Sequence, residues 1–122
     1  MMTSPRHLRV YVSGPYTAAT PGEVEQNVNR AIDAGLELVR RGHKPFIPHL
    51  THFVERRAKE RKIQVAWEDY IEWDRAWLDA CDVVLCLGWS KGVDIEMKRA
   101  TELGLPIFTD IAAVSVFAAQ QG

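Results

Sequence analysis

The sequence predicts an α/β fold: a single-domain, three-layer sandwich of the Rossmann or flavodoxin type with a parallel sheet of four or five strands. Short apolar segments rich in β-branched residues alternate with longer segments of helical periodicity. One short segment, residues 82–87, is apolar after its first residue, as expected of a strand covered on both faces. The length of 122 residues suits one domain, 1–122, and no internal repeat or linker interrupts it.

The first strand is expected at residues 8–13, where LRVYVS ends at Gly14. A helix follows, because Thr20 fits an N-cap with Pro21 as the first helical residue, and Gly42 ends it. Its predicted apolar stripe consists of Val24, Val28, Ala31, Ile32, Gly35, Leu36 and Val39. The second strand is expected within residues 43–50, HKPFIPHL, where prolines interrupt it.

The second half of the chain continues the alternation of helices and strands. The predicted elements are a highly charged helix at 52–62, a helix at 67–80, a strand at 82–87, a helix at 92–103, a strand at 106–109 and a helix at 111–119. The helix at 67–80 is expected to carry an apolar stripe of Tyr70, Ile71, Trp73, Trp77 and Leu78. Gly104 ends the next helix, and Asp110 caps the last one.

Composition excludes several function classes. The formal net charge is −1, which gives no general attraction to nucleic acid or anionic lipid. No apolar stretch reaches the roughly 20 residues that span a bilayer, and the first residues do not form a signal peptide, so we expect a cytoplasmic protein. Cys81 and Cys86 are expected to be buried free thiols, since a C-x4-C pair alone is not a zinc site.

Polar residues follow three of the predicted strands. In open parallel sheets, ligands bind at the carboxyl ends of the strands, where the strand order reverses. The segments expected at that edge are residues 13–17, 49–52 and 88–96. Gly14 would let backbone amides approach an anion, although a plain turn is the simpler alternative.

Two carboxylates stand out from the remaining acids. Asp74 lies one helical turn from Tyr70 and Leu78, so it either faces inward or is solvated with its acidic neighbours. Glu96 follows the 82–87 strand at the start of a helix, in the stretch Ser90-x-Gly92-x-Asp94-x-Glu96. Backbone amides there could hold a phosphate or sugar hydroxyl; an acid-rich first turn is the alternative.

Three histidines, at positions 43, 49 and 52, lie near the second strand. Their spacing matches no metal motif, so no metal site is predicted, and we expect histidines of a loop or of the surface. His49 is the best candidate among them for a substrate contact. The basic run at 55–62 mixes Glu with Arg and Lys, which favours a solvated helix over an RNA-binding one.

Taken together, these motifs resemble the nucleoside 2-deoxyribosyltransferase-like superfamily. The resemblance runs from VYVSGPYT at 10–17 to ELGLPIF at 102–108, and its most specific part is EWDRAWLDACDVVLCLGWSKGVDIEMKRATELG at 72–104. That part has an acid-x-Asp on a helix, a DVV strand and Ser-x-Gly-x-x-x-Glu opening the next helix. The nearest branch is that of 2′-deoxynucleoside 5′-monophosphate N-glycosidases and related small bacterial and phage proteins.

The resemblance implies roles for individual residues. Glu96 matches the family's nucleophile, and Asp74 matches a helix aspartate that supports catalysis at the sugar and base. Ser90 and Gly92 match a phosphate-proximal turn, while Tyr11 and Gly14 match the strand-one motif. The chain departs from the family in having Pro15 and Tyr16 instead of a basic, glycine-rich continuation, and Asp94 where glycine is frequent.

The predicted activity is hydrolysis of the bond between base and sugar in a nucleoside or its 5′-monophosphate, without metal or redox cofactor. The candidate substrate-binding residues are Tyr11, Gly14, Pro15, Tyr16, His49, Trp89, Ser90, Gly92 and Asp94. Base exchange by a deoxyribosyltransferase, NAD cleavage and non-catalytic binding of a nucleotide remain alternatives. The resemblance also implies a homodimer or higher homo-oligomer.

Overall fold

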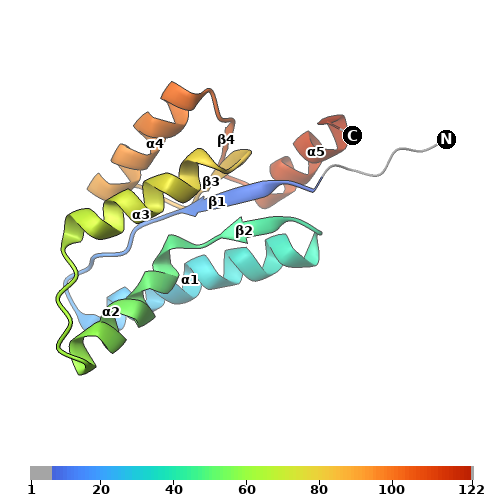
Figure 1. Cartoon of the computed structure of the whole chain (residues 1–122). Helices are drawn as coiled ribbons and strands as arrows, with labels where there is room; N and C mark the ends of the chain where they lie inside the picture. Colours follow the sequence, from blue (N-terminus) through green and yellow to red (C-terminus); the bar gives the residue numbers. More distant parts are fainter. Residues whose placement is uncertain (1–6, 122) are drawn as a thin grey trace.

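A computed structural model of the chain describes residues 7–121 and contains a sheet of four parallel strands. The strands are β1 (Arg9–Ser13), β2 (Lys44–Phe46), β3 (Val83–Cys86) and β4 (Ile107–Phe108), in the order β2-β1-β3-β4. The chain adds β2 on one side of β1 and β3 on the other (Figure 1). The strand order therefore reverses between β1 and β3, which is where open α/β sheets bind ligands.

Helices cover both faces of this sheet and confirm the predicted three-layer α/β sandwich. They are α1 (Pro21–Arg40), α2 (Thr51–Glu60), α3 (Trp67–Asp79), α4 (Lys91–Leu103) and α5 (Ile111–Gln121), with a 3-10 turn, η1 (Pro48–Leu50), before α2. Figure 1 shows α1 on one side of the sheet and α3 and α4 on the other. None of the helices described between residues 7 and 121 is long and apolar enough to cross a membrane.

Two apolar clusters fill the spaces on either side of the sheet. Val10 and Val12 of β1 point toward α1 and α5, whereas Tyr11, between them, points toward α3 and α4. The central residues of β3 are wholly buried, which confirms the prediction of a strand covered on both faces. Cys81 is buried and Cys86 half-buried, and both thiols are free.

The helix α1 begins as predicted but presents a slightly different face to the sheet. Thr20 Oγ1 accepts a hydrogen bond from the Glu23 amide at 3.2 Å, which confirms the cap. The buried residues are Val28, Ala31, Ala34, Gly35 and Leu38. Leu36 and Val39, assigned to the stripe from the sequence, are 62% and 57% exposed. The buried set follows the 3.6-residue period through position 38, which leaves both of these side chains outside it.

The strand predicted within residues 43–50 is shorter than expected, because its second half forms η1. Pro48 has no amide hydrogen for a sheet and starts the turn instead. The Leu50 amide donates to the Ile47 carbonyl at 3.1 Å, and the Thr51 hydroxyl donates to the Pro48 carbonyl at 2.9 Å. This turn buries His49.

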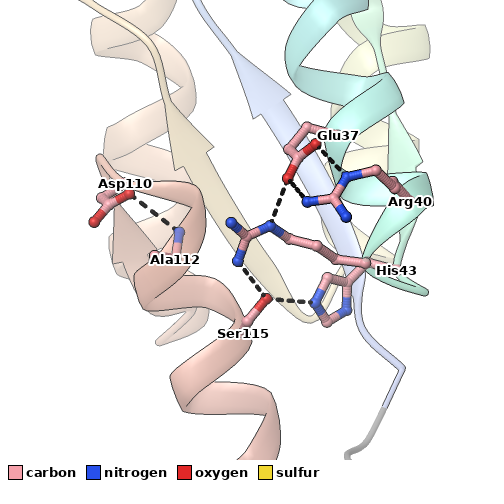
Figure 2. Close-up of polar contacts among 7 residues, drawn as sticks. Glu37, Arg40, His43, Asp110, Ala112 and Ser115 are labelled. Atoms are coloured by element: carbon pink, nitrogen blue, oxygen red, sulfur yellow. Dashed lines mark hydrogen bonds and ion pairs between the residues drawn. The ribbon is translucent and has the colours of Figure 1, made fainter.

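At the amino end of the sheet, polar contacts join α1, the turn before β2 and α5 (Figure 2). Glu37 accepts hydrogen bonds from Arg40 and Arg41, and Arg41 also donates to the Ser115 hydroxyl at 3.2 Å. His43 accepts a hydrogen bond from the Leu8 amide at 3.3 Å. His43 lies in the loop just before β2, as the prediction of a loop or surface histidine allows, but it is buried, with 3% exposure, and not at the surface.

The predicted apolar stripe of α3 is only partly buried. Leu78 is 1% exposed, but Trp73 and Trp77 are 42% and 51% exposed. Trp77 stacks on Phe46 of β2, and Trp73 stacks on Tyr70 within the same helix. The two indole rings thus lie in ordered aromatic pairs on the surface rather than in the core. As predicted, Asp110 caps α5 by accepting from the Ala112 amide at 3.1 Å.

Candidate functional site

The carboxylate of Glu96 lies at the point where the strand order reverses. After β3, Ser90 caps α4 by accepting a hydrogen bond from the Val93 amide at 3.1 Å. Glu96 stands in the second turn of α4 and points toward β1. The Tyr11 hydroxyl donates to Glu96 Oε2, and the Ser13 hydroxyl donates to Oε1 at 3.1 Å. Both carboxylate oxygens are therefore held by hydroxyl groups of one strand.

Ser13 is a site residue that the sequence did not single out. Tyr11 and Ser13 are two residues apart, so a β-strand presents both side chains on the same face. Both are 0% exposed, which means that neither hydroxyl has water as an alternative partner. The sequence feature that could have identified Ser13 is the two-residue period of the strand, which places it on the same face as Tyr11. Ser13 is also a hydroxyl residue at the carboxyl end of the central strand.

Burial raises the pKa of Glu96 from about 4.5 to about 7, although the hydrogen bonds from Tyr11 and Ser13 act in the opposite direction. The pKa of Tyr11 is raised far above its ordinary range, first by burial and then by the charges of Glu96 and Asp74. Tyr11 accordingly keeps its proton and acts as a hydrogen-bond donor throughout the neutral pH range.

Asp74 of α3 is the second acid of the site. It is half-buried, and burial followed by the charge of Glu96 raises its pKa to about 7. Its Oδ1 atom is buried without a hydrogen-bond partner among residues 7–121. Glu96 has two hydroxyl donors that favour its ionised form, whereas Asp74 Oδ1 has none. The pKa values of the two acids are both about 7, and the difference in donors favours the proton on Asp74 when the pair shares one.

His49 supports the loop that follows β1. Its Nε2 lies 3.0 Å from the Gly14 carbonyl oxygen and 3.1 Å from that of Pro15, so Nε2 carries the hydrogen and donates to both. Burial lowers the pKa of His49, which is 4% exposed, and the ring is neutral at pH 7. His49 therefore lies in the turn that connects β2 to α2 and is buried there, not at the surface. Its Nδ1 is buried without a partner among the described residues.

Gly14 permits a close approach between the loops that follow β1 and β3. A Cβ atom at this position would lie 3.1 Å from Leu87 Cβ, closer than such atoms ordinarily pack. Arg30 of α1, not singled out from the sequence, donates a hydrogen bond to the Leu87 carbonyl. A side chain at position 14 would press on Leu87, so packing restricts this position, whatever the Gly14 amide contributes to a ligand.

Tyr16 connects the loop after β1 to α2. Its hydroxyl lies 2.8 Å from His52 Nδ1, and its carbonyl accepts from Asn27 Nδ2 at 3.1 Å. From the other side, Tyr70 of α3 donates to Glu55 of α2. The helix α2 is therefore tied both to the β1 loop and to the helix that carries Asp74.

The remaining predicted residues lie at the start of α4 or just before it. Trp89 is 73% exposed, and the Ser90 hydroxyl is occupied by the helix cap. Gly92 is half-buried, and a Cβ atom there would meet only Ser90 Oγ, at 3.8 Å. Asp94 pairs with Lys98 at 3.1 Å along the helix surface. No contact among the described residues brings Asp94 to the carboxylate of Glu96.

The centre of this site is a pair of acids that differ in their surroundings. An ionised carboxylate held by two hydroxyls can attack an electrophilic carbon, and a neighbouring protonated acid can give its proton to a leaving group. Perturbed acids of this kind concentrate at functional sites. In the described part of the chain, no group of three or more His, Cys, Asp or Glu side chains is arranged to hold a metal ion.

Comparison with known proteins gives a family but no activity. No curated protein matches the chain. One family model covers residues 8–110, a range that includes Tyr11, Asp74 and Glu96. The chain therefore belongs to the family described as "Domain of unknown function (DUF7768)".

Proposed function

We propose that the protein cleaves the N-glycosidic bond of a nucleoside or nucleoside 5′-monophosphate, with Glu96 as nucleophile and Asp74 as general acid. One observation carries the proposal: Glu96, held by the Tyr11 and Ser13 hydroxyls, lies near a second acid whose pKa is raised to about 7. The sequence resemblance to nucleoside 2-deoxyribosyltransferase-like proteins supports the same two roles.

In the first step, one oxygen of the Glu96 carboxylate forms a bond to C1′ of the sugar. The bond between C1′ and the base nitrogen breaks, and its electron pair leaves with the base, which takes the proton of Asp74. In the second step, water attacks C1′, Glu96 leaves as a carboxylate, and Asp74 takes a proton from the water. The sugar product then carries a hydroxyl at C1′, and both acids return to their starting states.

Other residues at the same sheet edge suit substrate binding. Tyr16 and Trp89 present aromatic side chains, 37% and 73% exposed, on which a base could stack. The loop of Gly14 and Pro15, held by His49, would lie beside the sugar. A cytoplasmic location is part of the proposal, because free cysteines are typical of a reducing compartment.

Two related reactions use the same chemistry. If a second free base resolves the covalent intermediate, the protein is a deoxyribosyltransferase, and if the leaving group is nicotinamide, it cleaves NAD. A non-catalytic nucleotide-binding module is the alternative outside catalysis. The carboxylate at the centre of the site argues against that alternative, since an anionic ligand gains nothing from a nearby negative charge.

The test is release of free base from a panel of ribonucleosides, deoxyribonucleosides, their 5′-monophosphates and NAD, followed by chromatography. We expect Glu96→Gln to lower the rate by three orders of magnitude or more, and Asp74→Asn by about a hundredfold. Glu25→Gln, an exposed change on α1, is the control and should retain full activity. Full activity in Glu96→Gln would rule out the nucleophile, and adding a second base separates transfer from hydrolysis.

A further inference from the structure

Glu55 is an acid in a strongly basic part of the chain, yet it pairs with none of its basic neighbours. Residues 56–62 contain five Arg or Lys side chains, all of them exposed. Arg57 pairs with Glu60, whereas Glu55 is half-buried and makes no ion pair with any residue between 7 and 121. A carboxylate that loses part of its hydration is stable only where donors replace the water. Glu55 is therefore separate from the solvated charges of α2.

Three segments meet around Glu55. Tyr70 of α3 donates a hydrogen bond to its Oε2 atom. Tyr16, in the loop after β1, lies close enough for the charge of Glu55 to raise its pKa, after the larger effect of burial. One turn before Glu55 in α2, His52 Nδ1 lies 2.8 Å from the Tyr16 hydroxyl oxygen. Glu55 thus lies between the loop after β1 and the helix that carries Asp74.

The neighbours of Glu55 belong to the proposed site. Tyr70 precedes Asp74 by four residues, so the two side chains share one face of α3. The ring of Tyr16 lies edge-on to that of His49, with 6.3 Å between the ring centroids. The base of a bound nucleoside would receive the proton of Asp74 and could stack on Tyr16. A base in that position would have the Glu55 carboxylate at its outer edge.

The Glu55 carboxylate can only accept hydrogen bonds. The Tyr70 hydroxyl occupies Oε2, and no residue between 7 and 121 donates to Oε1. Tyr70 keeps its proton, because burial, followed by the hydrogen bond to Glu55 and the charge of Glu55, raises the pKa of Tyr70 to about 12. The Oε1 atom is therefore a charged acceptor that is available to a ligand, and hydrogen bonds to charged groups are the strong ones.

We propose that Glu55 selects nucleobases with an exocyclic amino group by accepting a hydrogen bond from that group at Oε1. This inference rests on the proposed function and adds the class of base to it. Adenine, cytosine and guanine carry such an amino group, whereas hypoxanthine and uracil carry only exocyclic carbonyl oxygens. A carboxylate accepts from an amino group, but its charge repels a carbonyl oxygen at the same place. A purely structural Glu55, which only ties α2 to α3, would give no preference among bases.

The test compares substrates that differ in this group: adenosine with inosine and cytidine with uridine, in ribose and deoxyribose forms, with and without the 5′-phosphate. For each pair we take the ratio of kcat/KM for the amino-bearing base to kcat/KM for the other base. Dividing the ratio of a variant by that of the wild type cancels the intrinsic difference between the leaving groups. We expect Glu55→Gln to lower the ratio by about tenfold to a hundredfold. Its amide oxygen accepts from Tyr70, so its NH2 group faces the base and donates to a carbonyl instead.

Two control variants separate recognition of the base from the contact between helices. Tyr70→Phe removes the hydrogen bond between α3 and α2 but keeps the carboxylate, so it should retain the wild-type ratio. Glu60→Gln makes the same chemical change as Glu55→Gln at an exposed position of α2, and it should also retain that ratio. Circular dichroism melting verifies that each variant is folded. An unchanged ratio in Glu55→Gln would overturn the inference and leave the roles of Glu96 and Asp74 intact.

A wild type that releases no base from any substrate contradicts the proposed function, and binding then tests the selection of the base by itself. Equilibrium dialysis measures the affinities of adenosine 5′-monophosphate and inosine 5′-monophosphate for the wild type and for Glu55→Gln. We expect the wild type to prefer the adenine nucleotide and the variant to lose this preference. If the wild type binds neither nucleotide or both equally, or if the variant keeps the preference, Glu55 does not select the base.

Discussion

Two hydroxyl groups on one face of β1 favour the ionised form of Glu96, against the effect of its burial. A buried carboxylate without donors would take up a proton at neutral pH and lose its nucleophilic character. Tyr11 and Ser13 each stabilise the ionised form by donating to one oxygen. Tyr11 does not lose its own proton, because burial and the two neighbouring acids raise its pKa well above neutrality.

Removing the Ser13 hydroxyl should therefore raise the pKa of Glu96. We expect Ser13→Ala to move the acidic limb of the pH–rate profile upward and to lower the rate at pH 6 about tenfold, since a hydrogen bond to a charged group contributes about 1.5–3 kcal/mol. Titration of the Glu96 carboxyl carbon by NMR measures the same change without any activity. Ser13→Thr, which keeps the hydroxyl, should restore the titration toward that of the wild type.

The control for this change is Thr51→Ala, which removes a hydroxyl that donates to the Pro48 carbonyl, away from Glu96. It should leave the titration of Glu96 unaltered. An unchanged Glu96 titration in Ser13→Ala would show that Ser13 does not hold the carboxylate. If the titration moves but no base is released even by the wild type, the contact is real and the proposed reaction is wrong.

At the level of elements, α1 packs closely on the segment that contains β2, and Gly35 makes this approach feasible. A Cβ atom at position 35 would lie 2.3 Å from Ile47 Cδ1 and 3.0 Å from Ile47 Cγ1. Gly22, in the first turn of the same helix, has no atom within 4 Å of such a Cβ. One helix thus contains two glycines, of which only one is needed for packing.

These two glycines should respond in opposite ways to alanine. Gly22→Ala should stabilise the protein by about 0.4–1 kcal/mol, because alanine restricts the unfolded chain. Gly35→Ala has the same benefit, but overpacking against Ile47 costs about 1–3 kcal/mol, so we expect a net loss of about 1–2 kcal/mol. Urea unfolding of both variants measures the difference. A gain in stability for both would mean that Ile47 moves aside freely.

Sequence patterns predicted the elements best where local chemistry defines their ends. The Thr20 cap and Gly42 bounded α1 correctly, and the apolar run at 82–87 identified β3. The strand expected within residues 43–50 ends at Phe46, because Pro48 begins a turn that His49 and Thr51 stabilise through their side chains. Such side-chain contacts depend on which loops lie next to each other in the folded chain. They cannot be predicted from a local sequence pattern.

At the level of the whole molecule, the strand order brings residues that are far apart in the sequence together in one site. Glu96 and Ser13 are 83 positions apart, yet they meet because β1 and β3 are neighbours at the reversal point. The sequence placed Glu96 at this edge, because it follows the 82–87 strand, and it singled out Asp74 within the helix predicted at 67–80. It could not predict the contact of Glu96 with Ser13, because that contact depends on the direction in which α4 presents its second turn.

Burial of the Glu96 carboxylate lowers the stability of the folded chain, and the size of this loss should depend on pH. Glu96 has an ordinary pKa near 4.5 and a folded pKa of about 7. Between these values the folded chain holds a proton that the unfolded chain has released, so the free energy of unfolding falls as the pH rises. Glutamine has no proton to lose, and its amide can still accept from Tyr11 and donate to the Ser13 oxygen.

We therefore expect Glu96→Gln to gain stability relative to the wild type as the pH rises from 5 to 8, by up to about 3 kcal/mol. Asp74 acts in the same direction, because its pKa falls once the charge of Glu96 is absent. Urea unfolding at several pH values measures the difference, with Glu25→Gln as the exposed control. A difference that stays constant with pH would mean that Glu96 titrates as an ordinary surface acid. An inactive variant that is more stable at pH 8 would show that the buried carboxylate is retained for chemistry and not for folding.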